Sequence, residues 1–314
     1  MRLKNFVKQL LSVFVLGGTI YYVYLHLGDF QEAPVFNLTA VVPLIIVSLG
    51  FQFLQALIFK YQTQLFSLNL SVKHWFGLAA TSAMYNLLFP ARGGLFARGY
   101  FLQKKYQFQY SHYAGLMLIM LILGLFITSF ASLLAHAWNI YEYAWLNKST
   151  FTVALAAMAT STFVFLFILI VPKKRIGNLV KNWARINSLW DGFSQISSQL
   201  NLNRKALFLL TLSFLTTVLV MSARLLFSGS LLGLDLTLPL CIIIQTMVGL
   251  SVFVSFTPGN LGVKEGIIVA LLTSQGIAPE TAIIVAGVDR LCSALVILLF
   301  GVPFHFVLIK DNDL

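Results

Sequence analysis

The stretch 255–266, with the sequence SFTPGNLGVKEG, constrains the fold of this chain more than any other segment. About twenty mostly apolar residues precede it, as in a membrane helix, yet it holds a proline, three glycines and the adjacent pair Lys264 and Glu265. Backbone groups freed by such a break find no water in lipid, so protein must bury the break or it must line a wet cavity. The sequence therefore predicts an interrupted helix within the membrane, where a charge marks a candidate functional site.

An earlier stretch, 89–98, with the sequence FPARGGLFAR, resembles this break. Pro90 and Pro258 are 168 residues apart, and the predicted helices starting at 38 and 112 have counterparts at 206 and 280 with the same separation. The chain then divides into halves 1–135 and 150–309, each with three membrane crossings and one broken pair. Because three is odd, the second half is inverted relative to the first. Inverted repeats with broken helices are typical of transporters.

Composition indicates a single transmembrane domain over 1–314. Of the 314 residues, 59% are hydrophobic and 10% are charged, whereas soluble domains carry about 25% charged residues. The remaining apolar pieces, 75–89 with 95–102 and 238–256 with 266–275, have second arms too short to cross a bilayer. We therefore predict an all-α polytopic membrane protein with two re-entrant hairpins in an inverted repeat and six full transmembrane helices: 10–27, 38–59, 112–135, 150–171, 206–233 and 280–309.

The distribution of charge predicts the orientation. In this arrangement sixteen of the 21 Lys and Arg residues are cytoplasmic, as the positive-inside rule requires. Lys73 and Lys105 flank the first hairpin and lie on the same side. Both termini are then cytoplasmic in a bacterial inner membrane, and the segment 172–205 is a basic amphipathic connector, either on the membrane interface or as a solvated linker helix. The basic residues behind the net charge of +11 are explained by this orientation in the membrane. Nucleic acid is therefore not an expected partner.

Six charged residues remain near membrane depth: Arg92, Arg224, Lys264, Glu265, Asp289 and Arg290. A buried charge must be paired or hydrated, so the set predicts ion pairs, a polar cavity, or both. We expect Arg224 to pair with Glu265 or Asp289. The alternative is that Lys264–Glu265 and Asp289–Arg290 neutralise one another and lock the second hairpin to the last helix.

The hairpin tips are the candidate binding site. The free N–H groups at the start of a half-helix attract anions, and glycines allow a ligand to approach the backbone. An anionic headgroup, above all a phosphate, fits such a site better than a cation. Asn86 and Gln245 either line the cavity or make interhelical hydrogen bonds. The candidate substrate-binding residues are Asn86, Arg92, Gly93, Gly94, Arg98, Pro258, Gly259, Asn260, Gly262, Lys264, Glu265 and Arg290.

Enzymatic signatures are missing from the sequence. The five histidines are scattered without metal-ligand spacing, and neither a P-loop nor a Gly-x-Ser-x-Gly turn occurs. Cys241 and Cys292 lie in apolar segments, as small core residues do. We therefore expect no catalysis, cofactor or metal, although a transferase that uses Glu265 as a base stays open.

The residues 258–266, followed by Arg290, Gly301 and Pro303, resemble the lysylphosphatidylglycerol synthase transmembrane-region, or flippase-like, family. This family includes the membrane half of the bacterial multiple-peptide-resistance factor. The element Asn86-x-x-x-Pro-Ala-Arg-Gly-Gly-x-x-x-Arg98 is similar to its partner motif, whereas Asn260 replaces a usual glycine and Lys264 a common arginine. The resemblance implies translocation of lipids between leaflets, and this chain resembles a stand-alone member without the synthase domain.

The resulting hypothesis is a lipid flippase that moves an anionic or aminoacylated phospholipid, or a polyprenyl-phosphate-linked lipid. Its expected partners are membrane phospholipids and a separate lipid-modifying enzyme, with the oligomeric state open. A non-transporting scaffold or accessory subunit of a cell-envelope enzyme is the rival, and a sealed, dry hairpin interface with all six charges paired would favour it. A membrane-embedded lipid transferase is the third alternative.

Overall fold

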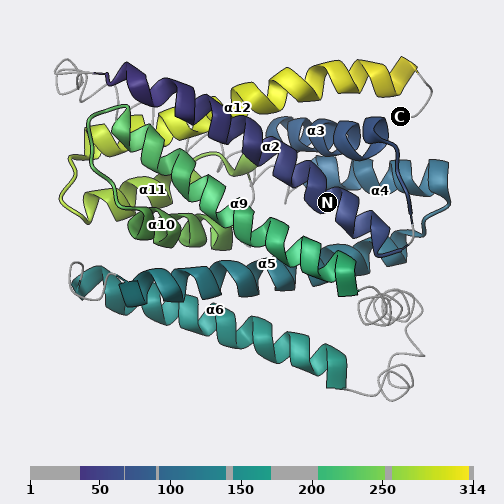
Figure 1. The fold of residues 1–314 in the computed structure, drawn as a ribbon, viewed down its shortest axis with the longest axis horizontal. Coiled ribbons are helices and arrows are strands. Elements are labelled where there is room, and N and C mark those ends of the chain that lie inside the picture. The colour runs from purple at the N-terminus through teal and green to yellow at the C-terminus, as the bar shows by residue number, and fades with distance from the viewer. Residues whose placement is uncertain are drawn as a thin grey trace, which may run out of the picture.

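The computed structural model describes residues 36–66, 68–89, 92–138, 144–170, 204–251 and 257–310, and every regular element in these ranges is a helix (Figure 1). The predicted helix at 10–27, Pro90 and the connector up to residue 203 lie outside the described residues. The elements are η1 (Leu38–Ala40), α2 (Val41–Gln64), α3 (Val72–Leu88), α4 (Gly93–Tyr106), α5 (Tyr110–Trp138), α6 (Ala144–Ile170), α9 (Arg204–Ser230), α10 (Leu238–Leu250), η4 (Pro258–Asn260), α11 (Val263–Thr273) and α12 (Pro279–Lys310).

Four helical segments in the described ranges are long and apolar enough to cross a membrane: Leu38–Gln64, α5, α9 and α12. Their mean hydropathies lie between 2.1 and 2.5, and they match the spans predicted at 38–59, 112–135, 206–233 and 280–309. Large apolar side chains on their outer faces are exposed, among them Ile46, Phe208 and Leu299. A surface of that kind suits lipid rather than water, and the all-helical membrane class is confirmed.

Helices α3 and α4 form an antiparallel pair that folds back on itself. At the open end of this pair, the Tyr106 hydroxyl hydrogen-bonds with His74 Nδ1 at 2.8 Å, and Lys105 Nζ lies 3.2 Å from His74 Nε2. The start of α3 and the end of α4 are therefore neighbours. Helix α4 is longer than the arm predicted at 95–102, and Tyr106 in its last turn packs against the buried cluster that Phe101 and Leu102 form with α2 and α3.

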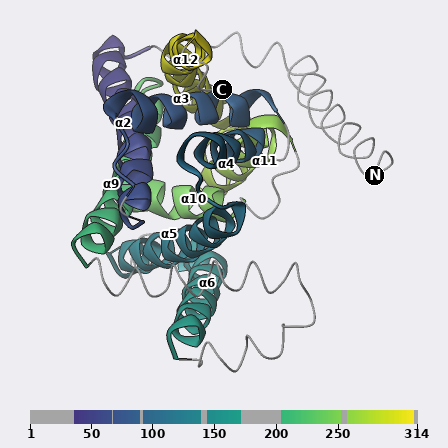
Figure 2. The same cartoon turned by 90° about the vertical axis from the view of Figure 1, so that its right-hand side faces the viewer.

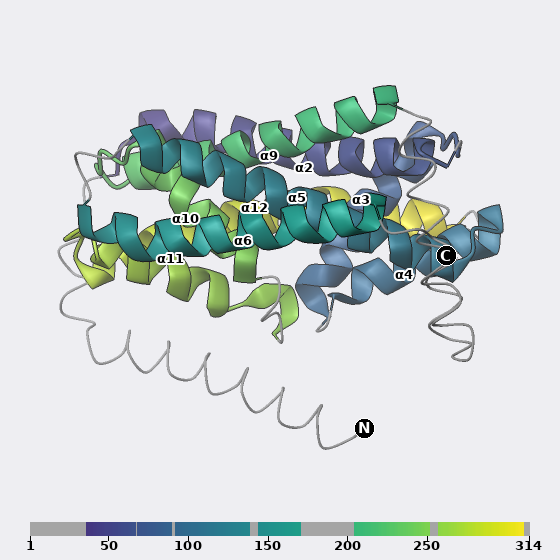
Figure 3. The same ribbon diagram turned by 90° about the horizontal axis from the view of Figure 1, so that it is seen from below.

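Helices α10 and α11 form the second fold-back pair, joined through η4. Ile244 of α10 and Leu272 of α11 share one buried cluster with Leu225 of α9 and Val285 of α12. Figures 1 and 3 show this pair at the end of the bundle opposite to α3 and α4. Each fold-back pair therefore has its own apolar core, which leaves the polar turns of the two pairs for the middle of the molecule.

The packing of the helices repeats between the two halves of the chain. Helices α2 and α9 run side by side, and the Asn37 N–H donates to the Leu231 carbonyl at 2.8 Å, so the start of one lies at the end of the other. Helix α3 packs on α12, and α10 packs on α5. Thus each fold-back pair lies against the last helix of the opposite half. Helix α6 lies along α5 at the edge of the bundle (Figure 2).

Candidate functional site

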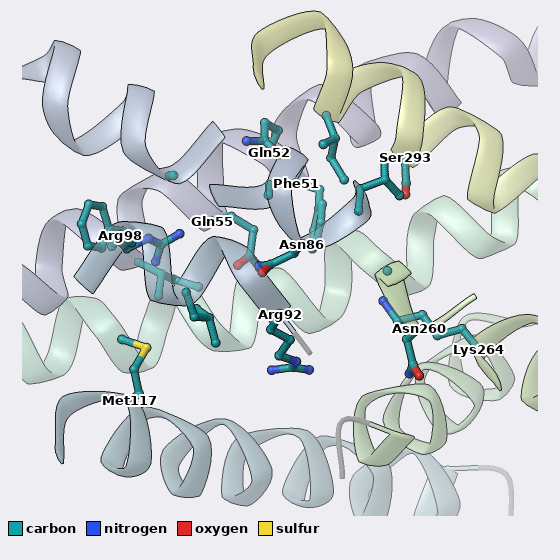
Figure 4. A pocket seen from close by; sticks show the side chains of 18 of the residues that line it. Phe51, Gln52, Gln55, Asn86, Arg92, Arg98, Met117, Asn260, Lys264 and Ser293 are labelled. Atoms are coloured by element: carbon teal, nitrogen blue, oxygen red, sulfur yellow. The ribbon is translucent and has the colours of Figure 1, made fainter. Parts of the chain in front are cut away.

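A cavity of about 450 Å³ lies between the two helix breaks. Its walls come from α2, both fold-back pairs and α12, with Met117 of α5 and Phe214 of α9 (Figure 4). Among the residues that the structure describes, no Asp or Glu lines this cavity. The polar and charged lining residues are Gln52, Gln55, Gln62, Asn86, Arg92, Arg98, Thr257, Asn260, Lys264, Arg290 and Ser293.

The first break contributes two arginines to this cavity. Arg92 precedes α4 in the left-handed backbone conformation, with φ 57° and ψ 49°, and its side chain extends into the open space (Figure 4). Arg98, less than two turns further along α4, lies with its guanidinium carbon 4.3 Å from the centre of the Phe59 ring. Its Nε is buried without a hydrogen-bond partner among the described residues. Both guanidinium groups therefore retain donors for a ligand.

The second break is held in shape by Arg290 of α12. Gly259 and Asn260 both have positive φ angles, of 58° and 59°, and Arg290 Nη1 donates to the Gly259 carbonyl at 2.8 Å. A Cβ at Gly259 would lie 2.6 Å from Arg290 Nη2 and would displace this guanidinium group, and the positive φ also favours glycine there. Asn260 Nδ2 donates to Ser251 Oγ at 2.6 Å, while its Oδ1 is buried without a partner in the described chain.

The two charges that begin α11 point in different directions. Glu265 Oε2 accepts the Gly262 N–H at 2.7 Å, and its Oε1 lies 3.4 Å from Arg290 Nη1. Lys264 lines the cavity and forms no ion pair in the part of the chain that the structure describes. Glu265 therefore neutralises Arg290 across the helix interface rather than its neighbour in the sequence.

Arg224 and Asp289 form a separate buried pair. Arg224 Nε and Nη2 donate to the two carboxylate oxygens of Asp289 at 2.7 and 3.0 Å, and the two side chains are only 6% and 10% exposed. The prediction that Arg224 pairs with an acid is confirmed, with Asp289 as the partner. Gln245, Lys264 and Glu265 border a void of about 30 Å³ together with this pair, and Gln245 is not among the residues of the larger cavity.

The balance of these pairs leaves the cavity positive. Arg92, Arg98 and Lys264 have no acidic partner within the described ranges, whereas Arg224 and Arg290 are each neutralised by a carboxylate. Unpaired charges in a low-dielectric setting are costly, so the lining is complementary to a ligand with negative charge. No three His, Cys, Asp or Glu side chains gather as metal ligands in the described residues.

One backbone N–H group at each half-helix start already has a side-chain acceptor inside the protein. Asn86 Oδ1 accepts the Gly94 N–H at 2.9 Å, as Glu265 does for Gly262. A Cβ at Gly94 would overlap the Ser82 carbonyl oxygen, so this glycine lets α3 and α4 approach each other. The charged groups of the site are side chains, and Gly94 acts in packing between α3 and α4.

Seven of the twelve predicted site residues line the cavity: Asn86, Arg92, Arg98, Gly259, Asn260, Lys264 and Arg290. The structure does not bring the other five to the cavity wall. Gly93 and Gly94 form the start of α4, while Pro258, Gly262 and Glu265 shape the second break and the start of α11. All twelve were predicted as binding residues because they lie at or near the two breaks or on the part of α12 that faces them.

Three glutamines of α2 line the cavity without having been predicted: Gln52, Gln55 and Gln62. Gln52 is 1% exposed, and both atoms of its amide are buried without a hydrogen-bond partner among the described residues. Their spacings of three and seven residues place them on one face of a helix. That spacing, within an otherwise apolar span, was the signal available in the sequence.

A comparison with protein families gives one match over most of the chain. The family model described as "Lysylphosphatidylglycerol synthase TM region" matches residues 9–301, which confirms the resemblance seen around residues 86–98 and 258–290. Neither a curated protein nor a solved structure gives a significant match.

Proposed function

Because this chain belongs to the lysylphosphatidylglycerol synthase TM-region family, we propose that it moves an anionic lipid headgroup between the leaflets of the bacterial cytoplasmic membrane. The family relates the chain to lipid modification or translocation in the membrane. The observation that carries the more specific proposal is the cavity of about 450 Å³ with three unpaired cations between the helix breaks. Such a site can hold a headgroup phosphate while the acyl chains stay beside the apolar outer faces of the helices.

In this proposal the two fold-back pairs are re-entrant hairpins that enter the membrane from opposite sides. Their position at opposite ends of the bundle (Figure 3) and the exchange of partners, α3 on α12 and α10 on α5, support an inverted repeat. With six crossings, both termini and the connector at 172–205 are cytoplasmic. A headgroup in the cavity then has one hairpin between it and each aqueous phase.

Movement of either hairpin relative to the opposite half would open the cavity to one side at a time. Two interhelical hydrogen bonds cross the interfaces that would have to shift: the Tyr85 hydroxyl with His305 Nδ1 at 2.7 Å, and Thr246 Oγ1 to the Thr128 carbonyl at 3.1 Å. Interhelical hydrogen bonds in membranes stabilise by only about 0.6 kcal/mol on average. These two hydrogen bonds by themselves would therefore add little to the free-energy cost of a rearrangement.

A leaflet-resolved assay in proteoliposomes tests the proposal. A fluorescent anionic phospholipid is placed in both leaflets, and the fraction that an impermeant quencher reaches is followed with time. We expect Lys264→Gln to slow the exchange at least tenfold, because it removes a charged donor from the cavity. Lys104→Gln removes an exposed lysine from α4, outside the cavity, and serves as the matched control.

Several outcomes would contradict this proposal. Exchange no faster than in protein-free vesicles would exclude translocation of the probe. Equal rates for the wild type, Arg290→Ala and Glu265→Gln would remove those two residues from the mechanism. Lipid binding without exchange would favour the rival function of an accessory subunit, which does not require the headgroup to leave the cavity on both sides.

A further inference from the structure

The charge of the cavity indicates which class of anionic headgroup the proposed site would bind. Resting on the proposed function, we infer that the headgroup carries at least two negative charges, as a phosphomonoester or a diphosphate does, and that the cavity prefers it to a cationic aminoacylated headgroup.

The first argument is the balance of charge. Arg92, Arg98 and Lys264 lack acidic partners among the described residues, and no carboxylate belongs to the described lining. A phosphodiester with one negative charge would leave two of the three cations uncompensated. A phosphomonoester carries close to two negative charges above neutral pH, and its three terminal oxygens accept hydrogen bonds strongly. Greater negative charge therefore compensates more of the cost of holding the three cations together.

The same lining is less suited to an aminoacyl group. Such a headgroup brings an ammonium ion, to which the buried amide oxygens of Gln52, Gln62 and Asn260 offer acceptors. However, no carboxylate among the described lining residues offsets its positive charge. Glu265 is the nearest acid to the second break, but its two oxygens are engaged by the Gly262 N–H and by Arg290. An ammonium ion placed beside Lys264 would add repulsion without a partner.

The three cations are spread along the cavity rather than gathered at one point. Figure 4 shows Arg98 on one side, Lys264 on the other, and Arg92 between them. Arg98 and Arg92 belong to the first break, and Lys264 belongs to the second. A row of cations from both breaks suits a diphosphate, because two consecutive phosphate groups present charged oxygens over a longer distance than a single phosphate group does.

Uncharged polar groups flank this row. The Gln52 amide, Gln62 Oε1 and Asn260 Oδ1 are buried without a hydrogen-bond partner in the described chain, and the three residues are 1%, 5% and 6% exposed. A buried polar atom is costly unless it is hydrogen-bonded. Gln52 Nε2 can donate to an ester oxygen of the headgroup, whereas the three amide oxygens can accept from its hydroxyl groups, next to the phosphate oxygens that the cations bind.

Competition between lipids of matched acyl chains tests the inference on the full-length protein. The protein in detergent is incubated at pH 8 with equimolar phosphatidic acid, phosphatidylglycerol and lysylphosphatidylglycerol, and retained lipid is quantified by native mass spectrometry. We expect phosphatidic acid, the phosphomonoester, to be retained about tenfold over phosphatidylglycerol, and lysylphosphatidylglycerol to be retained least of the three. Equal or preferred retention of lysylphosphatidylglycerol would overturn the inference.

Variants of the cations connect this preference to the cavity. Arg98→Gln and Lys264→Gln each remove one charge from a different break, and each should reduce the preference for phosphatidic acid about tenfold. Lys104→Gln should retain the wild-type preference. Two variants are used because one of them could fail to fold, which gel filtration would show. The other variant then still tests whether the cavity cations cause the preference for phosphatidic acid. An unchanged preference in a folded variant would refute the role of its cation.

Further arms of the same experiment distinguish a lipid headgroup from a soluble anion. They also distinguish failure of the proposed function from failure of the inference about charge. If free pyrophosphate binds while phosphatidic acid does not, the site takes a soluble anion and the lipid assignment is wrong. If phosphatidylglycerol is bound and moved as well as phosphatidic acid, translocation stands and the inference about charge fails. If phosphatidic acid is preferred but not moved between leaflets, the inference stands and the proposed function fails.

Discussion

The buried pair of Arg224 and Asp289 allows a quantitative test of how the bundle is held together. The perturbation is a double-mutant cycle with Asp289→Leu, Arg224→Met and the double variant. In the wild type two hydrogen bonds of 2.7 and 3.0 Å join side chains that are 6% and 10% exposed. Each single substitution therefore leaves a charge buried without its partner, while the double variant replaces both charges with apolar groups.

The expected magnitudes follow from this geometry. Removal of one member of a buried ion pair costs about 3–5 kcal/mol of folding free energy, whereas replacement of both by apolar residues is often neutral or stabilising. Arg224 Nη1 is already buried without a hydrogen-bond partner among the described residues, which places Asp289→Leu toward the upper end of that range. The double variant should lie within about 1 kcal/mol of the wild type, so the coupling energy should exceed about 4 kcal/mol.

The free energy of unfolding is measured in mixed micelles, with loss of helical circular dichroism as the readout and Asp235→Asn as the exposed control. This control should stay within about 0.5 kcal/mol of the wild type. A cost below about 1 kcal/mol for Asp289→Leu, or a double variant as unstable as the sum of both singles, would refute the reasoning. Because neither residue lines the larger cavity, the double variant should also exchange lipid at the wild-type rate.

Three further predictions concern the fold-back pairs. Gly94→Ala should destabilise the protein by about 1–3 kcal/mol through overlap with the neighbouring helix, whereas Gly50→Ala, with no atom within 4 Å, should be neutral or stabilising in the same unfolding assay. Asn86→Ala should cost about 1 kcal/mol by removing the acceptor at the start of α4, and Asn86→Asp should restore the thermal stability. Membrane-impermeant thiol labelling in a background without native cysteines should place a cysteine at 105 in the cytoplasm and one at 275 outside. Labelling of both from the same side would exclude opposed hairpins.

The sequence by itself determined the class of the protein and the places where its helices break. Apolar runs of membrane length and the proline and glycine signals around 90 and 258 are local properties, which do not depend on which helix packs on which. The family followed from local motifs as well, and the match over 9–301 confirms it. The ends of the short arms could not be predicted, since packing against other helices extends α4 to Tyr106.

Only the tertiary structure decided which charges are neutralised. Lys264 and Glu265 are adjacent in the sequence, as are Asp289 and Arg290, but neighbours on a helix point about 100° apart and do not face each other. Each member therefore meets a different element: Glu265 reaches Arg290, Asp289 reaches Arg224, and Lys264 is left to the cavity. The positions of the charges were local information, whereas their partners depend on how α9, α11 and α12 pack.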